Sequence, residues 1–152
     1  MGPEFSRVLV EVETALGERL DAVTKLRRIA AALQKLPGYT GVYFYELRGD
    51  LLHLVAHAGR DTQHVRIPVG EGICGLSART RDAVIVEDVR QDPRYLACNL
   101  ETQSEIVVPI MVAGRYLAQI DIDSDARAAF GKEDQKFLAG IAAKVVSLFP
   151  TA

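Results

Sequence analysis

The chain has no tryptophan and only two cysteines among its 152 residues, so sulfur chemistry can rest on few atoms. Two cysteines cannot form the dense disulfide framework of a small secreted domain. No apolar run approaches the ~18–20 residues that a membrane span needs. The N-terminal MGPEFSRVLVEVE also lacks the basic start and apolar core of a signal peptide. We therefore expect a cytoplasmic protein, and we set residues 1–5 aside as a remnant of cloning.

Neither sign of charge is in excess. Lys and Arg number 18 and Asp and Glu number 20, which gives a net charge of −2. Binding to a nucleic-acid backbone or to an anionic membrane surface normally requires a basic excess, so we expect neither partner. The chain is 49% hydrophobic and 25% charged, as is usual for globular proteins. Because it shows no internal repeat and no linker, we expect one domain over residues 1–152.

Apolar residues recur at spacings of three and four along two long stretches near the N-terminus and one at the C-terminus. This period predicts helices. The second stretch is ended by Pro37 and Gly38. A shorter helix is predicted after the GEG sequence at 70–72. The predicted helices cover residues 5–16, 19–36, 73–79 and 131–149.

Runs rich in β-branched and aromatic residues alternate with these helices and predict strands. The segment 91–103 between them is predicted to be an irregular loop. Short connections between neighbouring strands favour an antiparallel sheet of five or six strands with helices packed mainly on one side, an α+β fold. The predicted strands are 41–47, 51–57, 64–69, 83–89, 104–112 and 115–123.

Three acidic residues interrupt the last predicted hairpin, although acids are depleted in strands. Asp121 and Asp123 are two positions apart, so both side chains leave the same face of the strand. Ile120 and Ile122 then point to the other face, toward a helix-covered core. The hairpin register places Glu105 near both acids. We expect the three carboxylates to converge at one end of the sheet, the alternative being an exposed polar face of an antiparallel sheet.

The two cysteines lie close to these features in the chain. Cys98 belongs to the polar stretch LACNLETQSE and precedes Glu105 by seven residues. Cys74 follows GEG at a predicted helix start, where backbone N–H groups and the helix dipole favour a thiolate. The alternative for both is the ordinary one for reduced cysteines, small hydrophobic side chains in a core.

Four motifs, taken together, resemble one family. GEGICG at 70–75, LACN at 96–99, SEIVVPI at 104–110 and DIDSD at 121–125 stand in the order and spacing of the free methionine-(R)-sulfoxide reductases. These are single-domain enzymes of the GAF fold, and the resemblance runs from about residue 40 to 149. A generic GAF sensor domain shares the fold but not this set of motifs.

The resemblance implies roles for particular residues. Cys98 matches the family's catalytic nucleophile and Cys74 its second cysteine. Glu105, Asp121 and Asp123 match the carboxylates that hold the amino-acid end of free methionine sulfoxide and its sulfoxide oxygen. The family also implies a thioredoxin-like reductant and no cofactor. Three acids could hold a hard cation, but no sequential run of oxygen ligands supports this, and we expect no metal.

The chain departs from the family at three points. His64 stands where the family has its usual resolving cysteine, Asn99 replaces the common Asp after the nucleophile, and the pocket Trp is missing. Cys74 is then the only internal thiol that can resolve Cys98, unless an external thiol does so. A sensor that kept the pocket without the chemistry is the alternative function. His64 as a general base is a further alternative to a structural histidine.

The acids suggest a mechanism if the ligand is a zwitterion. A buried acidic site would pair with its α-ammonium. Three neighbouring carboxylates cannot all stay ionised cheaply, so at least one pKa should be raised. A neutral carboxyl group could then protonate the departing oxygen while the Cys98 thiolate attacks sulfur, leaving methionine and a sulfenic acid.

Overall fold

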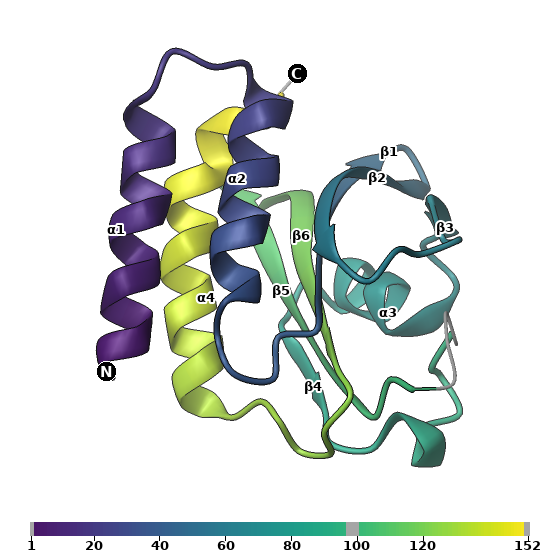
Figure 1. Ribbon diagram of the computed structural model, residues 1–152. Coiled ribbons are helices and arrows are strands. Elements are labelled where there is room, and N and C mark those ends of the chain that lie inside the picture. Colours follow the sequence, from purple (N-terminus) through teal and green to yellow (C-terminus); the bar gives the residue numbers. More distant parts are fainter. Residues whose placement is uncertain (1, 97–100, 151–152) are drawn as a thin grey trace.

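The structure is a computed structural model that describes residues 2–96 and 101–150 (Figure 1). None of the helices in these ranges is long and apolar enough to cross a membrane. The helices are α1 (Pro3–Gly17), α2 (Ala22–Gln34), α3 (Gly72–Thr80) and α4 (Lys132–Val145), with the 3-10 turns η1 (Val89–Gln91) and η2 (Val146–Leu148). The strands are β1 (Gly41–Arg48), β2 (Leu51–Gly59), β3 (Arg66–Pro68), β4 (Val84–Val86), β5 (Ser104–Val112) and β6 (Arg115–Ser124).

The six strands form one antiparallel sheet in the order β3-β2-β1-β6-β5-β4, as the α+β prediction requires. The two edge strands are shorter than predicted, with three residues each. Side-chain hydrogen bonds bend the chain beside both strands. Thr62 Oγ1 accepts from the His64 amide at 3.1 Å before β3, and Asp88 Oδ1 accepts from the Arg90 amide at 3.1 Å after β4. Such local bonds compete with strand pairing.

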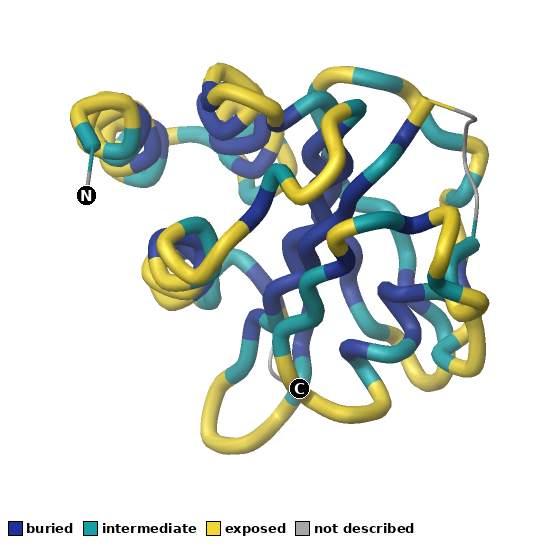
Figure 2. The backbone as a smooth tube through the Cα atoms, turned by 90° about the horizontal axis from the view of Figure 1, so that it is seen from below, coloured by how far each residue is buried: buried dark blue, intermediate teal, exposed yellow. Residues whose placement is uncertain are grey.

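Helices cover the two faces of the sheet unequally. α2 and α4 pack on one face, and α1 packs on these two helices, farther from the sheet (Figure 2). Ile120 and Ile122 are fully buried in this helix-side core, which confirms the predicted orientation of β6. Among the described α-helices, α3 alone covers the opposite face, where a second core includes Tyr43, Tyr45 and Cys74. The functional candidates among the described residues lie on this side of the sheet, around one pocket.

Candidate active site

The three acids converge as predicted. In the β5–β6 hairpin Glu105 lies opposite Asp123, and Asp121 is the next residue of β6 on the same face. A register shift between Ile110 and Met111 adjusts the pairing nearer the turn. Each of the three acids is only 5% exposed. The alternative of a solvated polar face is therefore wrong, because α3 and the loops beside it cover these carboxylates.

The acids lie in a narrow pocket between the sheet and α3. It contains about 370 Å³ of space outside atoms, part of it open to solvent, but the centres of water molecules can occupy only about 30 Å³. Among the described residues that line it, none is Lys or Arg. The lining residues are Tyr43, Tyr45, Thr62, His64, Ile67, Gly72, Ile73, Cys74, Tyr95, Leu96, Glu105, Asp121 and Asp123.

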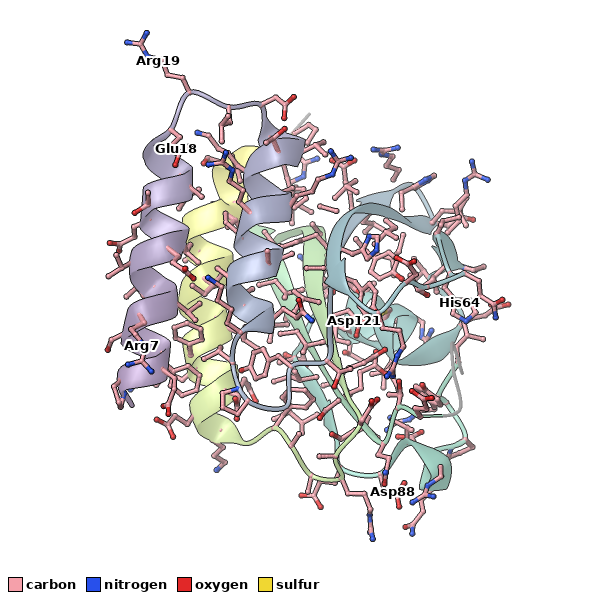
Figure 3. The ribbon with its side chains drawn as sticks, in the orientation of Figure 1. Arg7, Glu18, Arg19, His64, Asp88 and Asp121 are labelled. Atoms are coloured by element: carbon pink, nitrogen blue, oxygen red, sulfur yellow. The ribbon has the colours of Figure 1, made fainter. Side chains whose placement is uncertain are left out.

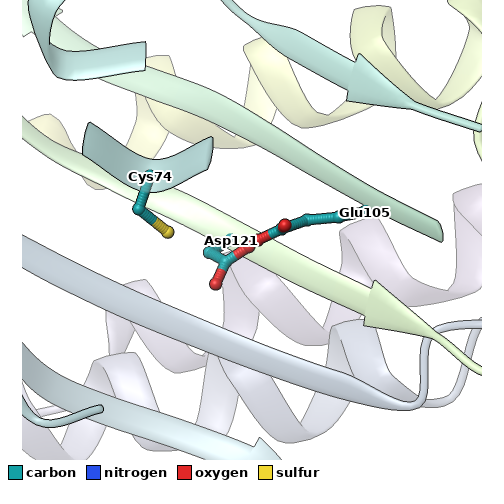
Figure 4. A group of neighbouring side chains, drawn as sticks. All are labelled: Cys74, Glu105 and Asp121. Carbon is teal, nitrogen blue, oxygen red and sulfur yellow. The ribbon is translucent and has the colours of Figure 1, made fainter. Parts of the chain in front are cut away.

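Cys74 belongs to the first turn of α3 and faces the acids (Figure 4). Its Sγ and one carboxylate oxygen each of Glu105 and Asp121 all lie within 4.8 Å of one another. Burial, followed by the negative charges of Asp121 and Glu105, raises the pKa of the Cys74 thiol well above its ordinary value. The expectation of a thiolate at this helix start is therefore wrong. Desolvation and two neighbouring acids outweigh the helix dipole here.

Asp121 is the central acid of the pocket. Its carboxyl group lies between Glu105 and Cys74 and hydrogen-bonds with both. Burial raises the pKa of Asp121, and these two hydrogen bonds offset only part of that effect. This confirms that at least one pKa in the cluster is raised. Among the described residues, Asp121 Oδ1 has no hydrogen-bond partner, although it is buried. A buried oxygen of this kind is a ready acceptor for a ligand's donor.

The raised pKa predicts how stability depends on pH. Folded Asp121 retains its proton above pH 3.8, the ordinary value, at which the unfolded chain loses it. The folded state then binds more protons, so the free energy of unfolding falls as pH rises through this window. Asp121→Asn removes the titrating group. Chemical denaturation from pH 3.8 up to about pH 8 should show a smaller fall for the variant than for the native chain, and equal falls would contradict the assignment.

Two tyrosines of β1, Tyr43 and Tyr45, also line the pocket, and the sequence interpretation assigned them no role. Tyr43 of β1 lies directly opposite Asp121 of β6, and its hydroxyl donates to the Arg60 carbonyl at 2.6 Å. The Tyr45 hydroxyl donates to the His64 carbonyl at 2.8 Å. Both residues are at most 2% exposed and present their rings to the pocket. Their spacing of two in a strand facing Asp121 is the signal that could have identified them.

His64, the alternative general base, lies toward the edge of the molecule in Figure 3, whereas Asp121 lies nearer the middle. It lines the pocket and is only partly buried. Its carbonyl is held by Tyr45 and its amide by Thr62, so its backbone has a defined position at the pocket. A role in proton transfer stays a prediction.

Gly75 makes close packing of α3 on the sheet edge possible. A Cβ at this position would lie 2.5 Å from the Val69 carbonyl oxygen, a backbone atom that cannot rotate away. Gly75→Ala should therefore lower the free energy of unfolding by about 1–3 kcal/mol. Gly140→Ala in α4 is the matched control, since nothing lies within 4 Å of its added Cβ. It should raise stability by up to about 1 kcal/mol through helix propensity. Equal effects of the two changes in urea denaturation would contradict this packing.

Cys98 and Asn99 lie outside the described residues. The described chain on both sides of them is close to the site. Leu96 lines the pocket, and the Glu101 carboxylate pairs with Arg60 Nη2 at 2.7 Å. Arg60 also forms a two-pronged pair with Asp125, at 2.6 and 2.7 Å.

Residues 21–147 match the GAF domain family. Free methionine-R-sulfoxide reductase of Escherichia coli is 31% identical over 89% of this chain and 81% of its own. The chain is a member of the GAF family and, within it, of the free methionine-R-sulfoxide reductases.

Solved structures agree with this membership. The type II free methionine-R-sulfoxide reductase from Thermoplasma acidophilum has a TM-score of 0.81 and 43% identity, with coverage of 84% of this chain and 91% of that one. The enzyme from Neisseria meningitidis, solved in complex with its substrate, has a TM-score of 0.88 and 32% identity, with coverage of 95% and 87%. Another relative, Protein YtsP of Bacillus subtilis, is 32% identical over 91% of this chain and 86% of its own.

Proposed function

We propose that this chain reduces free L-methionine-(R)-sulfoxide to methionine, with Cys98 as the nucleophile. The observation that carries the proposal is the buried pocket in which Glu105, Asp121 and Asp123 meet, with no Lys or Arg among the described residues that line it. A pocket with this charge favours a ligand that brings its own cation. The relatives named free methionine-R-sulfoxide reductases support a free amino acid as that ligand.

The acids bind the α-ammonium group of the substrate. The unpartnered Oδ1 of Asp121 offers one acceptor for its N–H donors, and Glu105 and Asp123 lie beside it. The rings of Tyr43 and Tyr45 line the same pocket and provide apolar and polarisable surface for the methyl and sulfur groups. They supply the aromatic surface that the missing Trp provides in the family.

The chemical step transfers oxygen from the substrate to Cys98. The Cys98 thiolate attacks the sulfoxide sulfur and forms an S–S bond, while a protonated carboxyl group in the acid cluster gives its proton to the sulfoxide oxygen. The oxygen then passes from the substrate sulfur to the Cys98 sulfur as the S–S bond and the substrate S–O bond break, which leaves methionine and a Cys98 sulfenic acid. Asp121 is the favoured donor, because burial holds its pKa above the ordinary value. Leu96 lines the pocket, and Cys98 follows it by two positions in the chain, a short distance along the backbone.

Cys74 resolves the sulfenic acid, or an external thiol takes its place. The Cys74 sulfur attacks Cys98, the hydroxyl leaves as water, and a Cys74–Cys98 disulfide forms. Asp121, which hydrogen-bonds with Cys74, accepts the thiol proton during this attack and passes it to the departing hydroxyl, which leaves as water. A thioredoxin-like protein then reduces the disulfide. His64 offers no thiol for this step.

The proposal extends to the setting of the enzyme. Residues 1–152 form one GAF-like catalytic domain, with residues 1–5 outside the functional part. We place it in the cytoplasm, where a thioredoxin-like reductant keeps cysteines reduced. It requires no cofactor and no metal. A homodimer formed through the helices of residues 5–36 and 131–148 is part of the same proposal, the alternative being that these helices only cover their own sheet.

One assay separates this function from a sensor role. The reduced protein is mixed with each epimer of methionine sulfoxide, without added reductant, and methionine and free thiols are counted. The R epimer should give one methionine per chain with loss of both thiols. The S epimer should give none. Binding without methionine formation or thiol loss would overturn the enzyme and favour a GAF module that senses a small molecule.

A further inference from the structure

A buried polar side chain behind Cys74 takes no part in the mechanism above. Gln119 of β6 is fully buried and lies on the same strand face as Asp121, two positions earlier. Its Nε2 donates to the Cys74 carbonyl at 3.0 Å and to the Tyr116 hydroxyl at 2.8 Å. Both amide protons are therefore used. The orientation of the amide follows from this, since the reversed amide would place Oε1 against the Cys74 carbonyl oxygen.

The bonds continue in one direction to the far end of α3. The Ser77 hydroxyl donates to the Asp82 carbonyl at 2.7 Å, so Tyr116 is the donor in its 2.9 Å bond to Ser77 Oγ. Gln119, Tyr116 and Ser77 thus form a chain of hydrogen bonds that connects β6 to the first turn of α3 and to Asp82, two residues after the end of α3. We call these three residues the Gln119 relay.

The first turn of α3 is also fixed from the other side. Gly75 packs so closely on the Val69 carbonyl that a Cβ would lie at 2.5 Å from it. Gly72, with φ of 67°, brings the turn against Leu96, where a Cβ would lie at 3.1 Å from Leu96 Cβ. Cys74 stands between these contacts and the Gln119 relay. Its backbone has little freedom to move.

The amide of Gln119 contains a buried acceptor that reduces stability, and packing alone does not explain why such a residue stands here. Among the described residues, Gln119 Oε1 has no hydrogen-bond partner, and it is fully buried. Such an acceptor lowers the stability of the folded state, whereas an apolar side chain of the same shape would lower it less. A polar residue at this position therefore points to a requirement other than stability. The group that it holds is the backbone of the only cysteine among the described residues.

We propose that Gln119 and Tyr116 are positioning residues for Cys74, and that they hold its sulfur where it can attack the oxidised Cys98. This inference rests on the proposed function. A disulfide requires Cα atoms about 4.4–6.8 Å apart and a narrow range of dihedral angles. Fixing one partner in advance raises the rate of such a step by reducing the freedom lost on reaction. In this chain His64 stands at the usual resolving position, so Cys74 is the internal thiol whose position matters for disulfide formation.

The step that the Gln119 relay should affect is formation of the disulfide. The Cys98 sulfenic acid and the Cys74 thiol form one S–S bond, the S–O bond of the sulfenic acid breaks, and one water leaves. The preceding release of methionine depends on Cys98 and the acid cluster. Loss of the Gln119 relay should therefore slow disulfide formation and leave the first release of methionine unchanged.

The test compares Gln119→Met with the native chain in a single turnover, without external thiol. Gln119→Met keeps a similar shape and removes both donors. Methionine, measured by rapid quench, should appear at the native rate. Loss of the Cys74 thiol should be slowed at least tenfold, and the sulfenic acid should accumulate and be trapped by dimedone. Tyr116→Phe keeps the hydrogen bond from Gln119 to the Cys74 carbonyl and removes the hydroxyl that accepts the second Gln119 proton. It should therefore slow disulfide formation less than Gln119→Met does.

Ile120→Val is the matched control. It lies between Gln119 and Asp121 on the helix-side face of the same strand and lowers stability without touching Cys74. It should leave both steps at native rates. A native rate of disulfide formation in both Gln119→Met and Tyr116→Phe would overturn the inference, while the proposed function would stand. Absence of methionine release from the native chain would instead overturn the proposed function.

Discussion

Cys98→Ser is expected to abolish methionine formation, with a loss on the order of 10⁴-fold or more. A serine hydroxyl is far less ionised than a thiol at neutral pH and cannot form a sulfenic acid. The measurement is methionine released in one turnover from methionine-(R)-sulfoxide by the reduced variant. Binding of the substrate should persist, because the acid pocket is unchanged.

Cys74→Ser is the matched control for this prediction. It retains the nucleophile, so one methionine per chain should still form in the first turnover, after which the sulfenic acid waits for an external thiol. Release at the native rate from Cys98→Ser would exclude Cys98 as the nucleophile. Loss of the first turnover in Cys74→Ser as well would show that the two thiols cannot be assigned separate steps.

Asp121→Asn should lower kcat/KM by about 10²–10³-fold. The change keeps the shape of the side chain but removes the carboxyl proton that the departing oxygen needs, and it places a neutral amide where the acid cluster meets the ammonium group. Losing one such electrostatic contact in an enclosed site costs about 2.7–4 kcal/mol of transition-state stabilisation. Steady-state kinetics with a thiol reductant, over a range of substrate concentrations, measures the effect.

Glu46→Gln is the control for Asp121→Asn. Glu46 is also an acid of low exposure in the same sheet, at 9%, but it pairs with Arg48 at 2.6 Å and does not line the pocket. Its substitution should change kcat/KM less than twofold. A comparable loss in both variants would mean that Asp121 acts through stability of the sheet and not through the pocket.

The alternation of side chains in β6 was enough to predict the convergence of the acids. A period of two places Asp121 and Asp123 on one face and Ile120 on the other, and the hairpin register brings Glu105 to them. These are properties of short segments. The protonation of Cys74 could not be predicted in the same way, because it depends on desolvation by elements distant in the chain. The sequence predicts the helix start and its dipole, but it does not predict that the Cys74 thiol is buried.

Other contacts of the site also depend on elements that are distant in the chain, and a short segment of sequence does not reveal them. Tyr43 reaches Asp121 only through the pairing of β1 with β6, two strands with 66 residues (49–114) between them in the chain. Gln119 and Ser77 meet through Tyr116 because α3 crosses the face of β6. The motif pattern indicated the family, but it contained neither contact. Tertiary packing of α3 supplies both.

The central claim is that the buried acids bind the α-ammonium group of a free amino acid. Calorimetric titration of Cys98→Ser with methionine-(R)-sulfoxide and with its N-acetyl derivative tests this claim most directly. Acetylation removes the positive charge and leaves the sulfoxide end intact. The free amino acid should bind at least about 100-fold more tightly, a difference of roughly 2.7 kcal/mol. Equal affinity for the two compounds would contradict the account.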